Sequence, residues 1–426
     1  MRTFKKNNDS RMGFKKKSVF GGRYFSNVVK LVSGSLISNA ILFLSIPIIT
    51  KLYSTAEFGE YSLIMSYALL LSIIISLRYE QVLPMLSDRH LEIMKYACLK
   101  IAIAMLIIFF LIVLIISSVF HVSEKYLYIP IIAFFCSTFE IYQYYSISKN
   151  KYNSIAYSKS CRSFFLVLSQ YLLSIFPSFG LLLSEVISRL SSLAPFKPFK
   201  SFDSKKLSWN INSHNKLLTK YKSYPILVLP SSLLNISVTL LTPIFISSEY
   251  GVEYLGVYYM AYKIMSIPEI VLTQSISHSF IGEVSRFVSG DNVNILSVFN
   301  KTVFTMLFVS CFSYASLYFC SHFILDYVDS SWNKLPEFIL VLIPLFISQT
   351  TMSSMYLPLA LIGLKKYQIV WDVIRTSSIL TSFYCSMIYD LDIFQFIIIL
   401  GMIVLSFYFV LYFILRNGFL NYEKIN

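Results

Sequence analysis

Long apolar runs, each of a length that can cross a lipid bilayer, recur from Val28 to Leu415 in this chain of 426 residues. A transmembrane helix needs about 20 mostly apolar residues, because the hydrocarbon core of a bilayer is about 30 Å thick. Hydrophobic residues make up 56% of the chain and charged residues only 14%, against about 45–50% and about 25% in an average soluble domain. The sequence therefore predicts an all-α, polytopic membrane protein and argues against a soluble enzyme.

The apolar runs and the breaks between them predict twelve transmembrane helices. Their expected ranges are 28–50, 60–84, 95–119, 126–148, 160–177, 179–195, 224–247, 254–281, 299–325, 337–362, 367–388 and 393–415. The expected organisation is a basic tail (1–27), a first six-helix half (28–195), a linker (196–223), a second six-helix half (224–415) and a short tail (416–426). No segment outside the spans is long enough to bury a hydrophobic core of its own.

The basic residues orient this arrangement, because Lys and Arg concentrate on the cytoplasmic side of membrane proteins. With the N-terminus inside, 28 of the 36 basic residues fall in or at the edge of segments expected to be cytoplasmic. The segments expected outside hold three, Lys51, Lys125 and Lys334. Both termini are therefore predicted to be cytoplasmic. The formal net charge of +14 is then expected to face anionic lipids of the inner leaflet rather than nucleic acid.

Signatures of enzymes and metal sites are missing from the sequence. The six cysteines lie in or beside apolar runs, and none forms a C-x-x-C or a Cys/His cluster, so neither a metal site nor a disulfide framework is expected. There is no Walker loop, G-x-S-x-G, H-E-x-x-H or dinucleotide fingerprint. We expect a chain that is not an enzyme and binds no cofactor. Residues 1–27 also lack the apolar core of a signal peptide.

An internal repeat divides the chain into its two halves. The first span reads SLISNAILFLSIPII from Ser35, and the seventh reads SSLLNISVTLLTPIF from Ser231. The matched residues are Asn39 with Asn235 and Pro47 with Pro243 at an offset of 196, then Gly59-x-Tyr61 with Gly256-x-Tyr258 at an offset of 197. Both halves start on the same side, so the repeat is parallel. Transporters built this way carry the substrate path at the interface between repeats; chance likeness of two apolar helices is the alternative.

Ten charged residues lie four or more residues from the ends of the predicted spans. They are the acids Glu80, Glu140, Glu185, Glu269 and Asp372 and the bases Arg78, Lys100, Arg189, Lys263 and Arg375. A charge at the centre of a transmembrane helix costs about 2.5–3.5 kcal/mol on insertion scales. Each of these side chains must therefore form an ion pair, extend to the membrane surface, or line a water-filled cavity.

Spacing along the helices separates these charges into pairs and unpaired groups. Glu185 and Arg189 are four residues apart and are expected to form a structural ion pair. Asp372 and Arg375, three apart, are similar, although Arg375 lies deeper and can face a cavity. In a helix the side chains of Arg78 and Glu80, two residues apart, point in different directions, so no neutralisation is expected between them.

Lys263 is the clearest candidate for a functional charge. It lies about ten residues into the eighth span, with no acid three or four positions away. An ammonium there needs a cavity, a partner on another helix or an anionic ligand. Glu269, beside Pro268, and Glu140 are candidates to carry a proton or a cation, with a structural hydrogen bond as the equal alternative. Lys100 is near enough to the inner boundary to extend to the surface.

Four stretches together resemble the Wzx-type polysaccharide flippases of the multidrug/oligosaccharidyl-lipid/polysaccharide (MOP) exporter superfamily. They are GSLISNAILFLSIPIITKLYSTAEFGEYSLI (34–64), SLRYEQVLPM (76–85), YPILVLPSSLLNI (224–236) and YGVEYLGVYYMAYKIMSIPE (250–269). The resemblance implies a MATE-like fold that moves undecaprenyl-pyrophosphate-linked O-antigen or capsule units to the outer leaflet of a bacterial inner membrane. It also implies a polysaccharide polymerase and a chain-length regulator as partners.

The resemblance also implies a cationic cavity between the halves that receives the pyrophosphate headgroup. By position in the matching stretches, Arg78 and Lys263 are expected in that cavity, and charge reasoning adds Arg375. Candidates for ion coupling are Glu80, Glu269 and Asp372.

Three other functions remain open from the sequence. A cation-coupled multidrug exporter of the same superfamily is expected to have an acidic or apolar cavity. An O-antigen polymerase, an enzyme, usually carries a large outer loop with Arg, whereas the outer loops here do not exceed roughly a dozen residues. A channel or scaffold does not require the doubled architecture.

Overall fold

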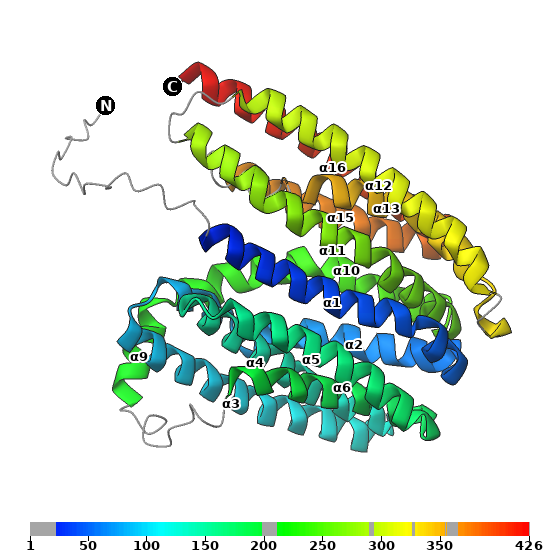
Figure 1. The fold of residues 1–426 in the computed structure, drawn as a ribbon. Coiled ribbons are helices and arrows are strands. Elements are labelled where there is room, and N and C mark those ends of the chain that lie inside the picture. The colour runs from blue at the N-terminus through cyan, green and yellow to red at the C-terminus, as the bar shows by residue number, and fades with distance from the viewer. Residues whose placement is uncertain are drawn as a thin grey trace.

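The computed structural model describes residues 23–197, 211–288, 294–325, 329–353, 355 and 365–425, and every regular element within them is helical. The first half contains α1 (Arg23–Leu52), α2 (Thr55–Ile75), α3 (Asp88–Phe120), α4 (Tyr128–Ser148), α5 (Tyr152–Leu172) and α6 (Pro177–Leu193). The second contains α10 (Leu229–Glu249), α11 (Val252–Val288), α12 (Ile295–Leu325), α13 (Leu335–Ser353), α15 (Lys365–Ile388) and α16 (Ile393–Ile425). Figure 1 shows the two halves as neighbouring helical bundles.

Shorter helical segments connect or flank the long helices. They are η1 (Tyr79–Met85), η2 (Glu124–Leu127), η3 (Leu173–Ile175), η4 (Ala194–Phe196), η5 (Tyr224–Val228) and η6 (Ser330–Trp332). Within the predicted linker 196–223, α9 (Ile211–Lys220) is a helix that packs on α3, and residues 198–210 lie outside the described part.

Each of the twelve predicted ranges overlaps one of the long helices, although the end of the range 337–362 lies outside the described residues. Among the described residues, seven helices are long and apolar enough to cross a membrane, or eight when the bent segment from Tyr224 to Glu249 is included. The helices α4, α5, α11 and α15 do not reach that apolarity, because polar and charged residues interrupt them. The count of twelve spans and the side of the membrane on which the termini lie stay predictions.

The peripheral helices expose their apolar side chains. Only 11% of the most apolar window of α3 and 17% of that of α12 is buried within the protein. Ile107, Ile115 and Val119 of α3 and Phe308 and Phe312 of α12 are all more than half exposed. Monomeric soluble proteins rarely expose continuous apolar surface of this kind. These surfaces are therefore suited to contact with lipid, as expected of a membrane protein.

The predicted helix over 60–84 is wrong in its second part. The helix α2 ends at Ile75, Leu77 and Arg78 adopt left-handed backbone angles (φ 52° and 60°), and the 3-10 segment η1 follows. Left-handed angles are unfavourable for residues with a side chain and interrupt a right-handed helix. Apolar residues continue on both sides of Arg78, Glu80 and Gln81, so the apolar pattern did not reveal the break.

The two halves meet closely where α2 crosses α11. A Cβ atom added at Gly59 would overlap the backbone carbonyl of Val252, and one added at Gly256 would overlap that of Thr55. The offset of 197 relates Gly59 to Gly256, and it also relates the contacted residues Thr55 and Val252. The contact is therefore reciprocal, as a twofold axis between the two halves requires. The repeated Gly-x-Tyr therefore marks the point of closest approach between the halves.

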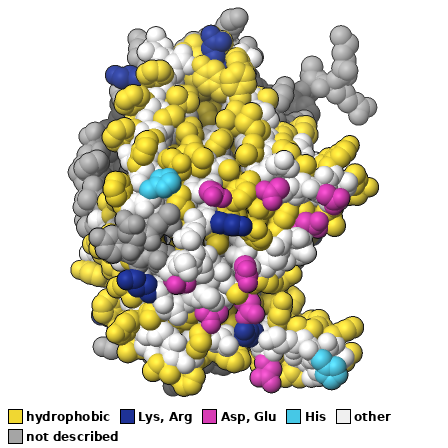
Figure 2. All heavy atoms as spheres, turned by 90° about the vertical axis from the view of Figure 1, so that its right-hand side faces the viewer, with side chains coloured by type: hydrophobic (Ala, Val, Ile, Leu, Met, Phe, Trp, Pro, Cys, Tyr) yellow, Lys and Arg dark blue, Asp and Glu magenta, His cyan; other side chains and the backbone are white. Residues whose placement is uncertain are grey.

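A second contact closes the same end of the molecule. The indole Nε1 of Trp332 donates a hydrogen bond to the carbonyl of Thr50 at 3.1 Å, and its ring packs edge-on against Phe58. Figure 1 shows the bundles converging toward this end, on the right of the view. Figure 2 looks onto that end and shows Asp and Glu side chains gathered across its middle, above an apolar rim.

Candidate functional site

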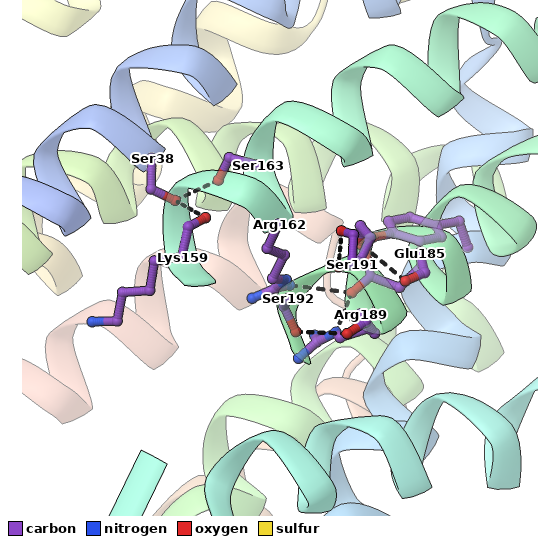
Figure 3. Close-up of polar contacts among 10 residues, drawn as sticks. Ser38, Lys159, Arg162, Ser163, Glu185, Arg189, Ser191 and Ser192 are labelled. Atoms are coloured by element: carbon purple, nitrogen blue, oxygen red, sulfur yellow. Dashed lines mark hydrogen bonds and ion pairs between the residues drawn. The ribbon is translucent and has the colours of Figure 1, made fainter. Parts of the chain in front are cut away.

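A buried carboxylate organises the charged residues between α5 and α6. Glu185 is fully buried and accepts from Arg189 Nε at 2.6 Å, from Arg162 Nη2 at 3.1 Å and from the Tyr61 hydroxyl at 2.9 Å. Arg189 lies on the same face of α6, four residues on, whereas Arg162 reaches across from α5 (Figure 3). The expected pair is therefore part of a larger network that joins three helices.

Lys263 lies on the other side of the junction, on α11. It lines a cavity of about 230 Å³ together with Met65 and Ser66 of α2 and Tyr259 of α11. Its ammonium is 5.9 Å from the centre of the Phe58 ring. Within the described part of the chain Lys263 donates no side-chain hydrogen bond and forms no ion pair.

The cavity and the carboxylate network adjoin each other. Tyr259, which lines the cavity, packs edge-on against Tyr61 at 6.0 Å, and Tyr61 donates a hydrogen bond to Glu185. We call Tyr61, Arg162, Glu185, Arg189 and Lys263 the interface cluster. It holds three cations and one carboxylate, a formal net charge of +2.

A further cation extends the cluster along α5. Lys159, one turn before Arg162, donates to the Ser35 hydroxyl at 3.0 Å. Ser38 of α1 is hydrogen-bonded to Ser163 and to the carbonyl of Lys159, which makes a polar seam between α1 and α5 (Figure 3). Lys159 has no carboxylate partner among the described residues.

Sequence reasoning missed both Lys159 and Arg162. The predicted span began at residue 160, so both were counted at the edge of the membrane. The helix α5 begins eight residues earlier, at Tyr152, and Arg162 therefore lies ten residues into it. The signal was available in YNSIAYSKSCRS (152–163), where a polar stretch long enough for three turns of helix precedes the apolar run.

Arg78 pairs with two acids in the first half. Its Nη1 is 3.4 Å from Glu80 Oε1 and 3.1 Å from Glu140 Oε2. The expectation that Arg78 and Glu80 point apart is wrong, because the left-handed residues before η1 remove the helical geometry on which it rested. Glu80 is fully buried, and its second oxygen has no hydrogen-bond partner among the described residues. Arg78 lines neither the Lys263 cavity nor the second cavity described next.

A second cavity, of about 250 Å³, lies within the second half between α10, α11, α13, α15 and α16. Arg375 lines it and is held by Asp372, 3.5 Å away, and by the ring of Trp371, 4.5 Å away. Glu269 does not line this cavity, but its carboxyl group interacts with the side chain of Gln349, which does. We call this space the second-half cavity; it shares lining residues with the Lys263 cavity, so the two adjoin.

Lys100 contacts the linker rather than the membrane surface alone. Its ammonium is 3.3 Å from Nδ1 of His214 on α9. Burial, together with the positive charge of Lys100, lowers the pKa of His214 below its usual value. This contact fastens α9 to α3 in the neutral state of the histidine.

No group of three or more His, Cys, Asp or Glu side chains is placed to hold a metal ion within the residues that the structure describes.

Comparison of the sequence with protein-family models and with curated proteins finds no match. The structure resembles the inward-facing form of a multidrug resistance MATE family transporter of the MOP superfamily (TM-score 0.62, 8% identity, 93% of this chain and 94% of that chain). It also resembles an outward-facing MATE form (TM-score 0.54, 11% identity, covering 94% and 96%). A MOP superfamily transporter from Pyrococcus furiosus, described as having reversed polarity of the binding pocket that suggests a different function, matches at a TM-score of 0.55 (11% identity, 93% and 95%). The chain therefore has the fold of the MATE transporters.

Proposed function

We propose that this protein is a flippase that moves an undecaprenyl-pyrophosphate-linked oligosaccharide across the bacterial inner membrane, and that the interface cluster holds the pyrophosphate. The observation that carries the proposal is the cluster's excess of positive charge: Arg162 and Arg189 share the carboxylate of Glu185, and Lys263 lines the neighbouring cavity with no acid paired to it among the described residues. Uncompensated cations at membrane depth are costly, and an anionic ligand removes that cost. A pyrophosphate carries the multiple negative charge that a net +2 requires.

The geometry of the cluster supports binding of such an anion. Glu185 fixes the two guanidinium groups while using only one N–H group of each, and a guanidinium has five. The Nε of Arg162 is buried with no partner among the described residues. Arginine forks suit the geometry of phosphate oxygens, and Lys263 adds a positive charge from the second half.

The proposed direction of movement follows from charge and from the closed end. The segments at the end seen in Figure 2 are poor in Lys and Arg, as expected of the outer side, and there the two halves meet through Gly59 and Gly256. Substrate then approaches from the opposite, cytoplasmic side. The helix α5 starts on that side, beside the ion pair of Lys149 with Asp88 at the beginning of α3. Lys159 therefore lies one turn nearer to that side than Arg162. We infer that Lys159 is the first cation that the headgroup meets.

A multidrug exporter is the second candidate function. The MATE transporter whose inward-facing form matches this fold is described as a multidrug resistance protein, and the second-half cavity is rich in aromatic side chains, with the carboxyl group of Glu269 interacting with its lining residue Gln349. A fold does not fix the ligand, however, and the Pyrococcus transporter is described as having the reverse pocket polarity. The cationic interface cluster favours an anionic substrate.

The proposal is tested by deleting the gene in its host. We expect lipid-linked oligosaccharide to accumulate on the inner leaflet and surface polysaccharide to disappear, with unchanged sensitivity to cationic drugs. Wild-type protein should restore export, and Lys263→Ala and Arg162→Ala should restore at most about a tenth of it at equal membrane abundance. Lys334→Ala, at an exposed lysine outside the cluster, is the matched control. Unchanged surface glycan together with increased drug sensitivity would establish the multidrug function instead.

Partners and surroundings follow from the same proposal. The basic segments are proposed to contact anionic lipids of the inner leaflet. A polymerase and a chain-length regulator are proposed to act on the exported unit. For Arg78 and Arg375 a headgroup role, and for Glu80, Glu269 and Asp372 an ion-coupling role, remain proposals that single substitutions in the same export assay can test.

A further inference from the structure

We propose that the second-half cavity binds the sugar residue that is attached to the pyrophosphate of the substrate, so that headgroup and glycan are held at two adjoining subsites. This inference rests on the proposed function and names the part of the substrate that the second subsite takes. It rests on three features of the cavity: its chemical lining, its charge balance and its position.

The lining combines aromatic rings with uncharged hydrogen-bonding groups. Tyr258, Tyr262, Trp371 and Tyr408 supply the rings, and Thr242 and Gln349 supply polar groups between them. A sugar ring has C–H faces that pack on aromatic surfaces and hydroxyls at its edge that need hydrogen-bond partners. A mostly apolar and aromatic site with a few placed polar groups is suited to orient such a ligand.

The charge of this cavity differs from that of the interface cluster. Among the described residues, Arg375 is the one cation that lines the cavity, and Asp372 balances it while Trp371 holds the guanidinium in place. The guanidinium therefore serves as a fixed set of N–H donors beside Tyr408, rather than as an uncompensated charge. Such a site favours a neutral polyhydroxy group over a second anion. Lys263 differs from Arg375, because no carboxylate is paired with it among the described residues.

Size and position favour the same ligand. The volume of about 250 Å³ lies just below the range of about 300–1,000 Å³ that is usual for drug-sized ligands, which suits a single sugar residue. Thr239, Tyr258 and Tyr262 line this cavity and the Lys263 cavity together. A sugar joined directly to a pyrophosphate at Lys263 would therefore lie next to the second-half cavity.

The internal repeat explains how two different subsites arose from one arrangement. Tyr61 and Tyr258 are matched by the offset of 197, and Arg162 and Arg375 each lie on the fifth long helix of their half. In the first half, the Glu185 carboxylate occupies the space beside the tyrosine and the arginine. In the second half, the corresponding space is open and aromatic. At this position the first half therefore holds a buried carboxylate and the second half holds a cavity.

The test compares two lipids that differ only in the glycan. The probes are undecaprenyl pyrophosphate and the undecaprenyl-pyrophosphate oligosaccharide extracted from the deletion strain, and binding is measured on the purified full-length protein in lipid nanodiscs. We expect the wild-type protein to bind the glycosylated lipid about tenfold or more tightly than the bare lipid. Val404→Phe, which fills the second-half cavity from α16, should abolish this difference and leave binding of the bare lipid unchanged.

Control variants separate the subsite from the fold and from the proposed function. Val410→Phe, at a half-exposed position of α16, should retain the preference for the glycosylated lipid. If Val404→Phe fails to fold, Tyr408→Leu replaces it as the test variant and should lose this preference. Lys263→Ala should weaken binding of both lipids. Equal binding of the two lipids by the wild-type protein, or equal weakening of both by Val404→Phe, refutes the sugar subsite while the flippase proposal stands. Failure of the wild-type protein to bind either lipid refutes both the sugar subsite and the flippase proposal. If the wild-type protein binds tetraphenylphosphonium and Val404→Phe abolishes that binding, the cavity is a site for organic cations instead.

Discussion

Replacing Glu185 by Gln is expected to destabilise the protein and, at the same time, to strengthen its binding of an anionic headgroup. Glutamine keeps the size of the side chain and an oxygen that accepts hydrogen bonds from both guanidinium groups, but it removes the negative charge. The net charge of the interface cluster then rises from +2 to +3, since three cations remain and no carboxylate.

The magnitude follows from how deeply each arginine is buried. Removing one partner of a buried ion pair costs about 3–5 kcal/mol. The Arg189 side chain is 9% exposed and loses a partner at 2.6 Å, whereas the Arg162 side chain is 37% exposed and is partly solvated. Only Arg189 therefore contributes the full penalty, and we expect about 3 kcal/mol. At roughly 2 °C per kcal/mol, the lower end of the range for domains of about 150–250 residues, the midpoint of thermal unfolding falls by about 6 °C.

The assay is thermal unfolding of the purified protein in detergent, followed by the loss of the monodisperse peak in size exclusion. The double variant Glu185→Gln with Arg189→Met removes the stranded cation and should recover most of the loss. In the binding assay, Glu185→Gln should bind undecaprenyl pyrophosphate more tightly than the wild-type protein. A midpoint within 1 °C of the wild type, or a double variant less stable than the single one, would show that Glu185 does not balance the buried arginines.

Three further predictions concern the crossing of the halves, the linker helix and the cluster around Arg78. Gly59→Leu should abolish transport in proteoliposomes without loss of folded protein, because the leucine Cβ overlaps the backbone of the facing half. Gly401→Ala should leave transport intact, because the alanine Cβ meets only ordinary contacts at 3.6–3.9 Å. Because the pKa of His214 is lowered in the folded state, the unfolded state binds more protons, and docking of α9 should weaken as the pH falls below about 6.5. Hydrogen-exchange protection factors of α9, corrected for the intrinsic exchange rate at each pH, should fall at acidic pH in the wild-type protein but not in His214→Gln. Arg78→Met should lower the unfolding midpoint by more than Glu140→Gln, because the arginine is the cation beside a fully buried acid whereas the Glu140 side chain is 40% exposed; equal shifts would contradict this.

The amino-acid sequence determined the features that depend on neighbours along the chain. Long apolar runs predict helices because a segment in lipid must satisfy its backbone hydrogen bonds within itself. The spacing of Glu185 and Arg189 puts them on one helical face. The repeat around Gly59 and Gly256 likewise appeared as a pattern in the chain, and its glycines are the residues at which the halves touch.

The tertiary structure decided which helices bring their charges together. Arg162 reaches Glu185 from another helix, and Arg78 pairs with Glu140, 62 residues further along the chain. Periodicity shows which face of a helix is polar but not which helix that face meets, so these partners were not predictable from spacing. The same holds for the break after Ile75, which depends on the left-handed backbone angles of Leu77 and Arg78, and for the second-half cavity, which exists only where five helices leave room between them.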